Sequence, residues 1–301
     1  MSVYDCFTYF NEDLVLDLRF HTLNEFVDKF VVVEATRDHA GKKKKLNFNL
    51  SNFKKYSNKV IYIVVDDIPE KVGSYKKKNY HENFVRENYH RNCISRGLTK
   101  ASEQDLIMIS DVDEIPNLTN LSIFNSKNKL AFFRQKFFRY KFNTCIPCSP
   151  IQKTLFKSDF IEWLGTGICL KKNLLSPQWL RDKRLEASKI LFFESRNIFK
   201  RLKRFFKYKF LLPQIINNGG GGGWHFSSVL SPEDMCLKLE SFGHGEFNKD
   251  QFKNLEIIRT KLNNNIDIFD SRIVLKSIEI DNVNFPSYIL KNRARFAQFI
   301  V

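Results

Sequence analysis

The first 111 residues alternate strand-like apolar runs with helix-like segments, and this order constrains the fold more than any other feature. Strands are predicted at "VYDCFTYF", "KFVVVEAT", "KVIYIVVDD" and "DLIMIS". Apolar residues repeat at helical spacing from Leu16 to Val27, and residues 81–98 predict a second helix that ends at Gly97. The alternation predicts an α/β fold with a central, mostly parallel, twisted sheet.

The second half of the chain mixes aromatic, basic and glycine-rich segments. The stretch "LAFFRQKFFRYKFN" predicts a strand that crosses the edge of the sheet. The stretch "SPEDMCLKLESFGHGEF" predicts a helix that Ser231 caps, with Pro232 in its first turn and Gly243 at its end. We therefore expect a C-terminal helical region.

The composition describes a folded protein with an excess of basic residues. The chain has 301 residues, 43% of them hydrophobic, and a net charge of +16. Such a charge favours anionic partners, which include nucleic acid, anionic lipid and phosphorylated ligands. Six cysteines contain one C-x-x-C pair, Cys145 and Cys148, so neither a disulfide framework nor a zinc site is predicted.

The N-terminal residues carry early acids and no unbroken apolar stretch, so they predict neither a signal peptide nor a membrane anchor. No window approaches the roughly 20 apolar residues of a spanning helix. A cytoplasmic location is expected, with peripheral contact at the inner face of a membrane as an alternative. The basic, aromatic segment 196–210 is the candidate for that contact.

Polar residues follow three of the predicted strands, at the point where each strand ends. Glu34 and Arg37 follow the second strand, Asp66 and Asp67 the third, and Asp111 and Asp113 the fourth. Because ligands of open α/β sheets bind beyond the carboxyl ends of the strands, these side chains predict a site at one edge.

The stretch "ISDVDEIP" carries the most specific of these signals. Alternate side chains of Asp-x-Asp point the same way, so Asp111 and Asp113 offer hard oxygen ligands suited to Mg²⁺ or Mn²⁺. A cation of this kind usually also holds a diphosphate. The alternative is a tight turn that Asp side chains cap and Pro116 ends. The strand context favours the metal site.

Three further stretches supply candidate residues. In "RENYHRNCISRGL", Arg86 and Arg91 suit phosphate or carboxylate partners, and the alternative is a solvated helix face. In "GGWHFSSV", the glycines allow close backbone approach and loop movement, and His225 beside Trp224 is a candidate metal ligand or phosphate contact. The alternative for a lone histidine is a structural role.

The stretch "KLESFGHGEF" contains Lys238, His244 and Glu246 within a few residues of one another. A general base needs a carboxylate or an imidazole within reach of the acceptor hydroxyl, so Glu246 and His244 are both candidates. Exposed polar residues at a helix end are the alternative of equal weight.

Taken in order along the chain, these stretches resemble glycosyltransferase family 17. The resemblance also covers "YDCFTYFNEDLVLDLRFHTLNEFVDKFVVVEATRDHAGKKKKLNF" and the late "NFPSYILKN". It implies a GT-A-like nucleotide-sugar-binding fold and an inverting transfer of N-acetylglucosamine from UDP-GlcNAc, helped by Mn²⁺ or Mg²⁺. By position, Asp111 and Asp113 match the D-x-D of the family, and His225 matches its W-H.

The resemblance divides one continuous catalytic domain into a nucleotide-sugar-binding half, residues 1–130, and an acceptor-side half, residues 131–301. Animal members of the family have a membrane anchor, which is not predicted here, and the run of five glycines is longer than the usual pair. We therefore expect a surface glycan or lipid-linked glycan as acceptor, rather than an N-glycan core. The residues expected to contact the donor are Glu34, Arg37, Arg86, Arg91, Asp111, Trp224 and Lys238.

Two other functions are compatible with parts of the sequence. A metal-dependent nuclease or nucleic-acid-binding protein would use the charge of +16 and the clustered acids. The basic residues are dispersed outside 196–210 and no nucleic-acid motif is present, so no nucleic-acid partner is expected. A non-catalytic sugar binder is the third reading, and the intact acids disfavour it.

Overall fold

In the computed structural model of the chain, three segments of ten or more residues and several shorter ones are not described. The described residues are 1–69, 82–119, 121, 124, 129–150, 152–153, 158–191, 214–217, 221–241, 252 and 254–301, with side chains described up to 187 in the helix that ends at 191.

Four parallel strands build the N-terminal part of the sheet. They are β1 (Val3–Thr8), β2 (Lys29–Ala35), β3 (Val60–Val65) and β4 (Leu106–Asp111), in the spatial order β4-β1-β2-β3. Their backbones pair in parallel register, for example Cys6 with Val31 and with Ile109. The predicted α/β class and the parallel arrangement of these strands are confirmed.

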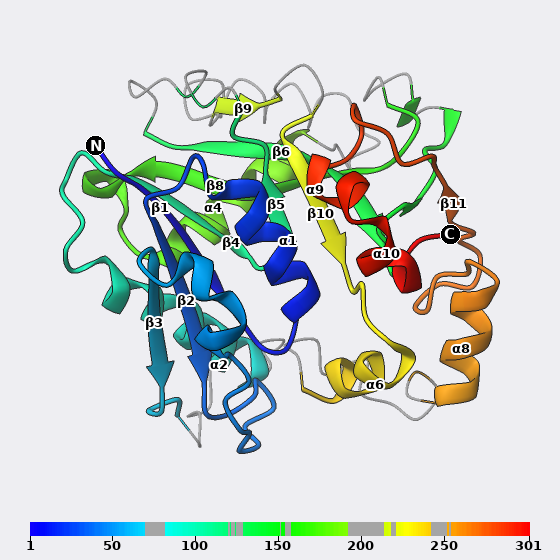
Figure 1. Cartoon of the computed structure of the whole chain (residues 1–301), viewed down its shortest axis with the longest axis horizontal. Coiled ribbons are helices and arrows are strands. Elements are labelled where there is room, and N and C mark those ends of the chain that lie inside the picture. The colour runs from blue at the N-terminus through cyan, green and yellow to red at the C-terminus, as the bar shows by residue number, and fades with distance from the viewer. Residues whose placement is uncertain are drawn as a thin grey trace.

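Both faces of this sheet are covered, which explains why its strands are apolar at successive positions. Phe30 and Val32 of β2 belong to a core on the face that carries α1 (Asp13–Leu23) and the 3₁₀ helix η1 (Leu50–Tyr56). Val31 and Val33 face the opposite core, which includes Leu180. That face carries α2 (Glu82–Asn92), the 3₁₀ helix η2 (Cys93–Leu98) and α4 (Pro177–Leu191) (Figure 1).

The second half of the chain extends the same sheet with mixed pairings. The antiparallel strand β8 (Glu162–Leu170) joins β4 to β6 (Ala131–Arg139). The predicted edge position of β6 is wrong, because β6 has partners on both sides. The remaining strands are β5 (Glu114–Pro116), β7 (Thr144–Cys145), β9 (Gln214–Ile216), β10 (Gly223–Ser227) and β11 (Lys276–Ser277).

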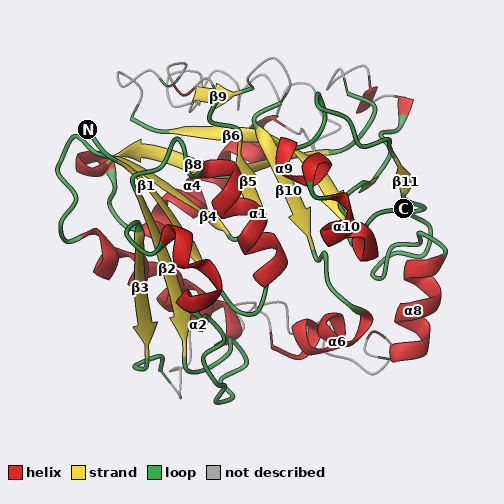
Figure 2. Cartoon of the chain, in the orientation of Figure 1, coloured by secondary structure: helices red, strands yellow, loops and turns green. Residues whose placement is uncertain are grey.

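Short helices follow the sheet in the C-terminal region (Figure 2). They are α6 (Pro232–Ser241), α8 (Leu255–Asn263), α9 (Ser287–Lys291), α10 (Arg293–Phe296) and the 3₁₀ helix η6 (Ala297–Phe299). A further 3₁₀ helix, η4 (Lys171–Asn173), follows β8. The cap of α6 is as predicted, since the backbone N–H of Asp234 donates to Ser231 Oγ at 3.0 Å.

The helix predicted for residues 81–98 is divided in the structure. It is α-helical only to Asn92 and continues as the 3₁₀ helix η2. A Cβ atom on Gly97 would lie 2.4 Å from Val31 Cγ1, so Gly97 permits the close approach of η2 to β2. In the described part of the chain, no helix is long and apolar enough to cross a membrane.

Candidate active site

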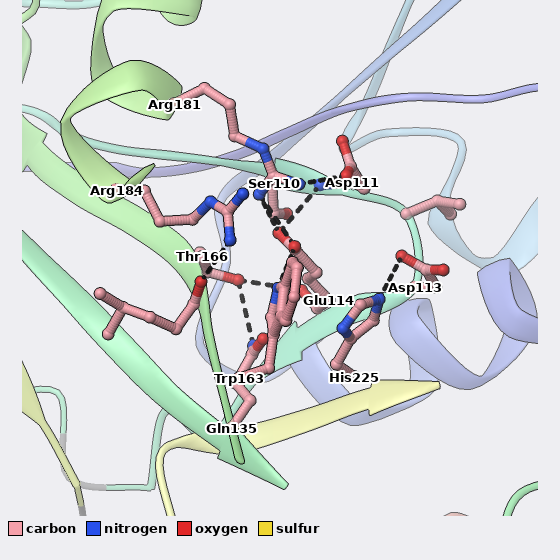
Figure 3. Close-up of polar contacts among 12 residues, drawn as sticks. Ser110, Asp111, Asp113, Glu114, Gln135, Trp163, Thr166, Arg181, Arg184 and His225 are labelled. Atoms are coloured by element: carbon pink, nitrogen blue, oxygen red, sulfur yellow. Dashed lines mark hydrogen bonds and ion pairs between the residues drawn. The ribbon is translucent and has the colours of Figure 1, made fainter. Parts of the chain in front are cut away.

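The three acids lie where β4 turns into β5, because Asp111 is the last residue of β4 and Glu114 is the first residue of β5. We call residues 111–114 the acidic turn. The strand before it is buried, and β5 after it pairs antiparallel with β10, which places His225 opposite Glu114. Figure 3 shows the carboxylates of the turn between helix α4, which carries Arg181, and strand β10, which carries His225. Sequence segments far apart therefore meet at the turn.

Two of the three carboxylates are engaged by arginines of the protein. Arg181 Nη1 donates to Glu114 Oε1 at 2.8 Å and to Oε2 at 2.6 Å, while its Nη2 pairs with Asp111 Oδ2. Arg91 Nη2 donates to the other oxygen, Asp111 Oδ1, at 3.1 Å. Trp163 Nε1 adds a hydrogen bond to Glu114 Oε1 at 2.7 Å. The repulsion between Asp111 and Glu114 is thus relieved by guanidinium groups.

These contacts shift the pKa values of the groups involved. Burial acts to raise the pKa of Asp111, but the guanidinium groups of Arg181 and Arg91 outweigh it and hold that pKa well below its usual range. Burial and the neighbouring Arg181 lower the pKa of Arg184 to about 9. Arg184 stays charged at neutral pH, and its guanidinium lies 4.7 Å from the Trp163 ring centroid. The turn therefore lies in strongly cationic surroundings.

Asp113 has a different environment from the other two acids. Its Oδ1 lies 3.4 Å from His225 Nε2, and its carbonyl oxygen accepts from the Phe226 N–H at 2.9 Å. The imidazole packs against Phe137 and Trp163, with ring centroids 5.0 Å away in each case. Burial acts to raise the pKa of Asp113, but His225 and then Lys238 lower it more, so the net direction is downward. Asp113 is ionised at neutral pH.

Asp113 and His225 are the described residues best placed to hold a metal ion. They come from different strands and bring one carboxylate oxygen and one imidazole nitrogen to the same point. His225 Nδ1 is buried and has no hydrogen-bond partner among the described groups. Across the described part of the chain, no group of three or more His, Cys, Asp or Glu side chains could hold a metal.

Two protein ligands with further positions open suit Mg²⁺ or Mn²⁺, because these ions commonly complete their shell with substrate phosphates and water. The pair therefore fits such an ion together with a diphosphate. Asp111 was predicted as a third ligand. Its two oxygens already carry guanidinium partners, which weakens what it can offer to a cation.

Lys238, on α6, is close enough to affect the acids electrostatically. Its charge lowers the pKa of Asp113, and it also lowers that of Glu12, whose pKa is nevertheless raised by burial. The structure thus brings Lys238 to the side of the site that holds Asp113.

Glu34 is bonded within the protein. It is fully buried, and its carboxylate accepts from Lys44 Nζ at 2.5 Å, from the Asn47 N–H at 2.7 Å and from Tyr62 Oη at 2.9 Å. These bonds attach the loop after β2 to the sheet. In this conformation Glu34 supports the loop, and its predicted contact with a nucleoside has no geometric support.

Arg37 and Arg86 lie at the same loop. Arg37 Nη1 donates to the carbonyl oxygen of Gly41 at 3.0 Å. Arg86 is buried and donates from Nε to the Pro69 carbonyl at 3.1 Å and from Nη2 to Glu82 Oε2 at 2.9 Å. Both side chains bond within the protein, and their predicted donor contacts stay predictions.

Trp224 also bonds inward, because its Nε1 donates to the Asn284 carbonyl at 2.7 Å. The preceding glycines permit close packing, as predicted. A Cβ atom on Gly223 would lie 2.2 Å from the Ile115 carbonyl oxygen, and the residue has φ +125°. His244, Glu246 and the segment 196–210 lie outside the described residues.

Arg91 and His225, which the sequence predicts as site residues, do contact Asp111 and Asp113, but three other arginines near the acidic turn were missed. Arg19, Arg181 and Arg184 were not singled out as site residues, and α4 was not predicted. One signal for α4 was present, since Ser176 precedes Pro177 and its Oγ accepts from the Trp179 N–H at 3.1 Å. Placing Arg181 and Arg184 three residues apart on that helix would have put both on one face.

Comparisons with known proteins relate part of the chain to a family. Residues 1–148 match the model of the family described as glycosyltransferase family 17. The first half of the chain is thus similar to glycosyltransferase family 17. The match includes the strands β1 to β4 and the acidic turn. It stops before α4 and β10, so the family 17 model does not reach Arg181 or His225.

Similar proteins carry a name from the same family. The human (Homo sapiens) β-1,4-mannosyl-glycoprotein 4-β-N-acetylglucosaminyltransferase is 25% identical over 301 residues, which covers 94% of this chain and 52% of the human protein. The rat (Rattus norvegicus) protein of that name is 33% identical over 106 residues, 34% of this chain and 19% of the rat protein. The chain thus spans about half the length of the human relative.

Among solved structures, an active-site mutant of LgtC aligns over 69% of this chain and 65% of its own, with 12% identity. Its TM-score is 0.27, so this alignment carries no argument.

Proposed function

We propose that the chain is a glycosyltransferase that moves N-acetylglucosamine from UDP-GlcNAc to a hydroxyl of a glycan acceptor, with inversion at the anomeric carbon. The observation that carries the proposal is the pairing of Asp113 with His225 at the carboxyl edge of the parallel strands. Asp113 lies inside the part that matches family 17, and His225 lies outside it. The names of the human and rat relatives support N-acetylglucosamine as the sugar and a glycan as the acceptor.

Asp113 and His225 would hold Mn²⁺ or Mg²⁺ together with the donor. When bound, such an ion neutralises the diphosphate and stabilises it as a leaving group. Asp113 contributes an ionised oxygen, and its position is fixed by the hydrogen bond from Phe226 to its backbone. The rings of Phe137 and Trp163 restrict the His225 imidazole.

The remaining charges suit an anionic donor. Arg91, Arg181 and Arg184 surround the acidic turn, and Lys238 lies on the side of Asp113. Their positive charge favours the approach of a diphosphate to the turn. The general base is proposed to be Glu246 or His244, which follow α6 in the chain.

The acceptor is proposed to be a surface glycan or a lipid-linked glycan. We also propose that the enzyme acts at the cytoplasmic face of a membrane, and that the basic segment 196–210 contacts the anionic lipid there.

A donor screen tests the proposed function. The chain is incubated with UDP- and GDP-sugars, in Mn²⁺ or in EDTA, and release of the nucleoside diphosphate is followed. UDP-GlcNAc should be hydrolysed in Mn²⁺ and not in EDTA, and Asp113→Asn should remove this activity. Asp159→Asn, at an exposed aspartate that pairs with Lys153, is the matched control and should leave it intact.

The nucleic-acid alternative is tested on the same preparation. Binding to duplex DNA is compared with binding to UDP at low and high salt. Saturable UDP binding that persists at high salt supports the transferase. Tight DNA binding, without release of nucleoside diphosphate from any sugar donor, would instead favour a nucleic-acid function.

A further inference from the structure

Arg19 of α1 contacts the acidic turn from its inner side. Its Nη1 donates to three backbone carbonyl oxygens, those of Asp111 at 3.1 Å, Val112 at 3.0 Å and Glu114 at 2.9 Å. The side chain of Arg19 is fully buried. Arg19 therefore reaches the turn through the protein interior, on the face of the sheet opposite α4.

The other nitrogen atoms of the Arg19 guanidinium, Nη2 and Nε, also donate hydrogen bonds. Nη2 donates to Ser110 Oγ at 2.6 Å and to Asp5 Oδ1 at 2.5 Å, and Nε donates to Asp5 Oδ2 at 2.7 Å. Asp5 is fully buried on β1. An arginine has five N–H protons, and here they serve six acceptors. The guanidinium is held by the fork of Asp5 and by Phe7, whose ring centroid lies 4.5 Å from it.

This arrangement has a consequence for the shape of the turn. Three carbonyl dipoles that converge on one buried point repel one another unless a cation lies there. Arg19 is that cation, and only a planar fork can serve the carbonyls and Asp5 together. With the carbonyls directed inward, the turn presents Asp113 toward His225 in β10.

We propose that Arg19 is a positioning residue, which sets the backbone of the acidic turn so that Asp113 meets His225. Arg19 is fully buried, so it acts on the site through the backbone of the turn. The proposal rests on the proposed function for the nature of the ligand, a metal ion with a nucleoside diphosphate. The shape of the turn does not depend on that assignment.

Two substitutions separate positioning from stability. Arg19→Lys keeps the charge but loses the fork, so the contacts with the carbonyls are broken. Asp5→Asn removes the other half of the same buried ion pair and leaves the donors that face the turn. The double variant Arg19→Met with Asp5→Leu removes both buried charges at once, so that a folded protein without Arg19 is available if Arg19→Lys fails to fold.

The first readout is calorimetric binding of UDP in the presence of Mn²⁺, with urea unfolding measured in parallel. Affinity should fall about 10-fold to 100-fold in Arg19→Lys and in the double variant, the range typical of residues that support metal ligands. The affinity of Asp5→Asn for UDP should stay within about 3-fold of that of the unmodified chain, even if urea unfolds Asp5→Asn as easily as Arg19→Lys. Equal losses in Asp5→Asn and Arg19→Lys, or no loss in Arg19→Lys, would overturn the positioning role.

The second readout needs no ligand. Amide exchange at Phe226, whose N–H donates to the Asp113 carbonyl, should be faster in Arg19→Lys than in Asp5→Asn. Unchanged exchange in Arg19→Lys would also overturn the role. If the unmodified chain binds no UDP with Mn²⁺, the proposed function fails, and the exchange comparison still decides the role of Arg19.

Discussion

Arg181 holds Glu114 in a two-pronged ion pair, with Nη1 at 2.8 and 2.6 Å from the two carboxylate oxygens. Glu114 is fully buried, and the same guanidinium extends to Asp111. Two acids of the turn thus serve as counter-ions of buried arginines. This leaves Asp113, which faces His225, as the acid best placed to meet a ligand.

Arg181→Met should destabilise the fold strongly. Glu114 would keep the hydrogen bond from Trp163 but remain a buried charge without a guanidinium. Breaking a buried pair in this way costs about 3–5 kcal/mol. Urea unfolding monitored by circular dichroism measures the loss in the free energy of unfolding.

The control combines Arg181→Met with Glu114→Gln. Because the glutamine is neutral and still accepts from Trp163, the double variant should recover about 1–3 kcal/mol of the loss. A double variant no more stable than Arg181→Met would show that the ion pair does not account for the effect.

Asp111→Asn should change the pH dependence of stability. The pKa of Asp111 is lowered in the folded chain, against the tendency of burial, by Arg181 and Arg91. A carboxyl with a lowered native pKa stabilises the fold above its unfolded pKa of about 4, and this stabilisation is lost as the pH falls toward the native pKa. The gap in unfolding free energy between the chain and Asp111→Asn should therefore shrink from about pH 6 to about pH 3. Parallel stability curves over this range would refute the assigned ion pairs.

Gly223→Ala should be more disruptive than Gly221→Ala. Both glycines have positive φ, +125° and +103°, so both substitutions strain the backbone. At Gly223 the new Cβ would also lie 2.2 Å from the Ile115 carbonyl, whereas at Gly221 its nearest neighbours are side-chain atoms of Lys136 from 3.4 Å outward. Strain plus overpacking should cost about 2–4 kcal/mol at Gly223, against about 1 kcal/mol at Gly221. Thermal unfolding of the two variants makes the comparison, and equal losses would contradict it.

The sequence was sufficient to predict the parallel part of the sheet and the position of the acidic turn. Apolar runs such as residues 106–110 end abruptly in acid, and both the strand and the site follow from this local pattern. The cap at Ser231 was predicted for the same reason, since capping depends on a few adjacent residues. The family assignment rests on similar short stretches.

Two other partners of the turn, Arg19 and Arg181, could not be predicted in this way. Arg19 and Arg181 meet the turn from helices on opposite faces of the sheet, and neither is near it in the chain. Glu34 looked like a site residue because it ends a strand, but its burial depends on how the loop around Asn47 folds back. Ion pairs and burial of this kind follow from tertiary packing, which local patterns do not contain.

The most direct test of the central claim is a calorimetric titration of UDP into the chain, with Mn²⁺ or with EDTA, for the unmodified protein, Asp113→Asn and Asp111→Asn. Binding by the unmodified protein should require Mn²⁺, and Asp113→Asn should abolish this dependence. Asp111→Asn should retain metal-dependent binding, because Asp111 acts through the arginines. UDP binding that is equally strong in EDTA, or that survives unchanged in Asp113→Asn, would contradict a metal site at Asp113 and His225.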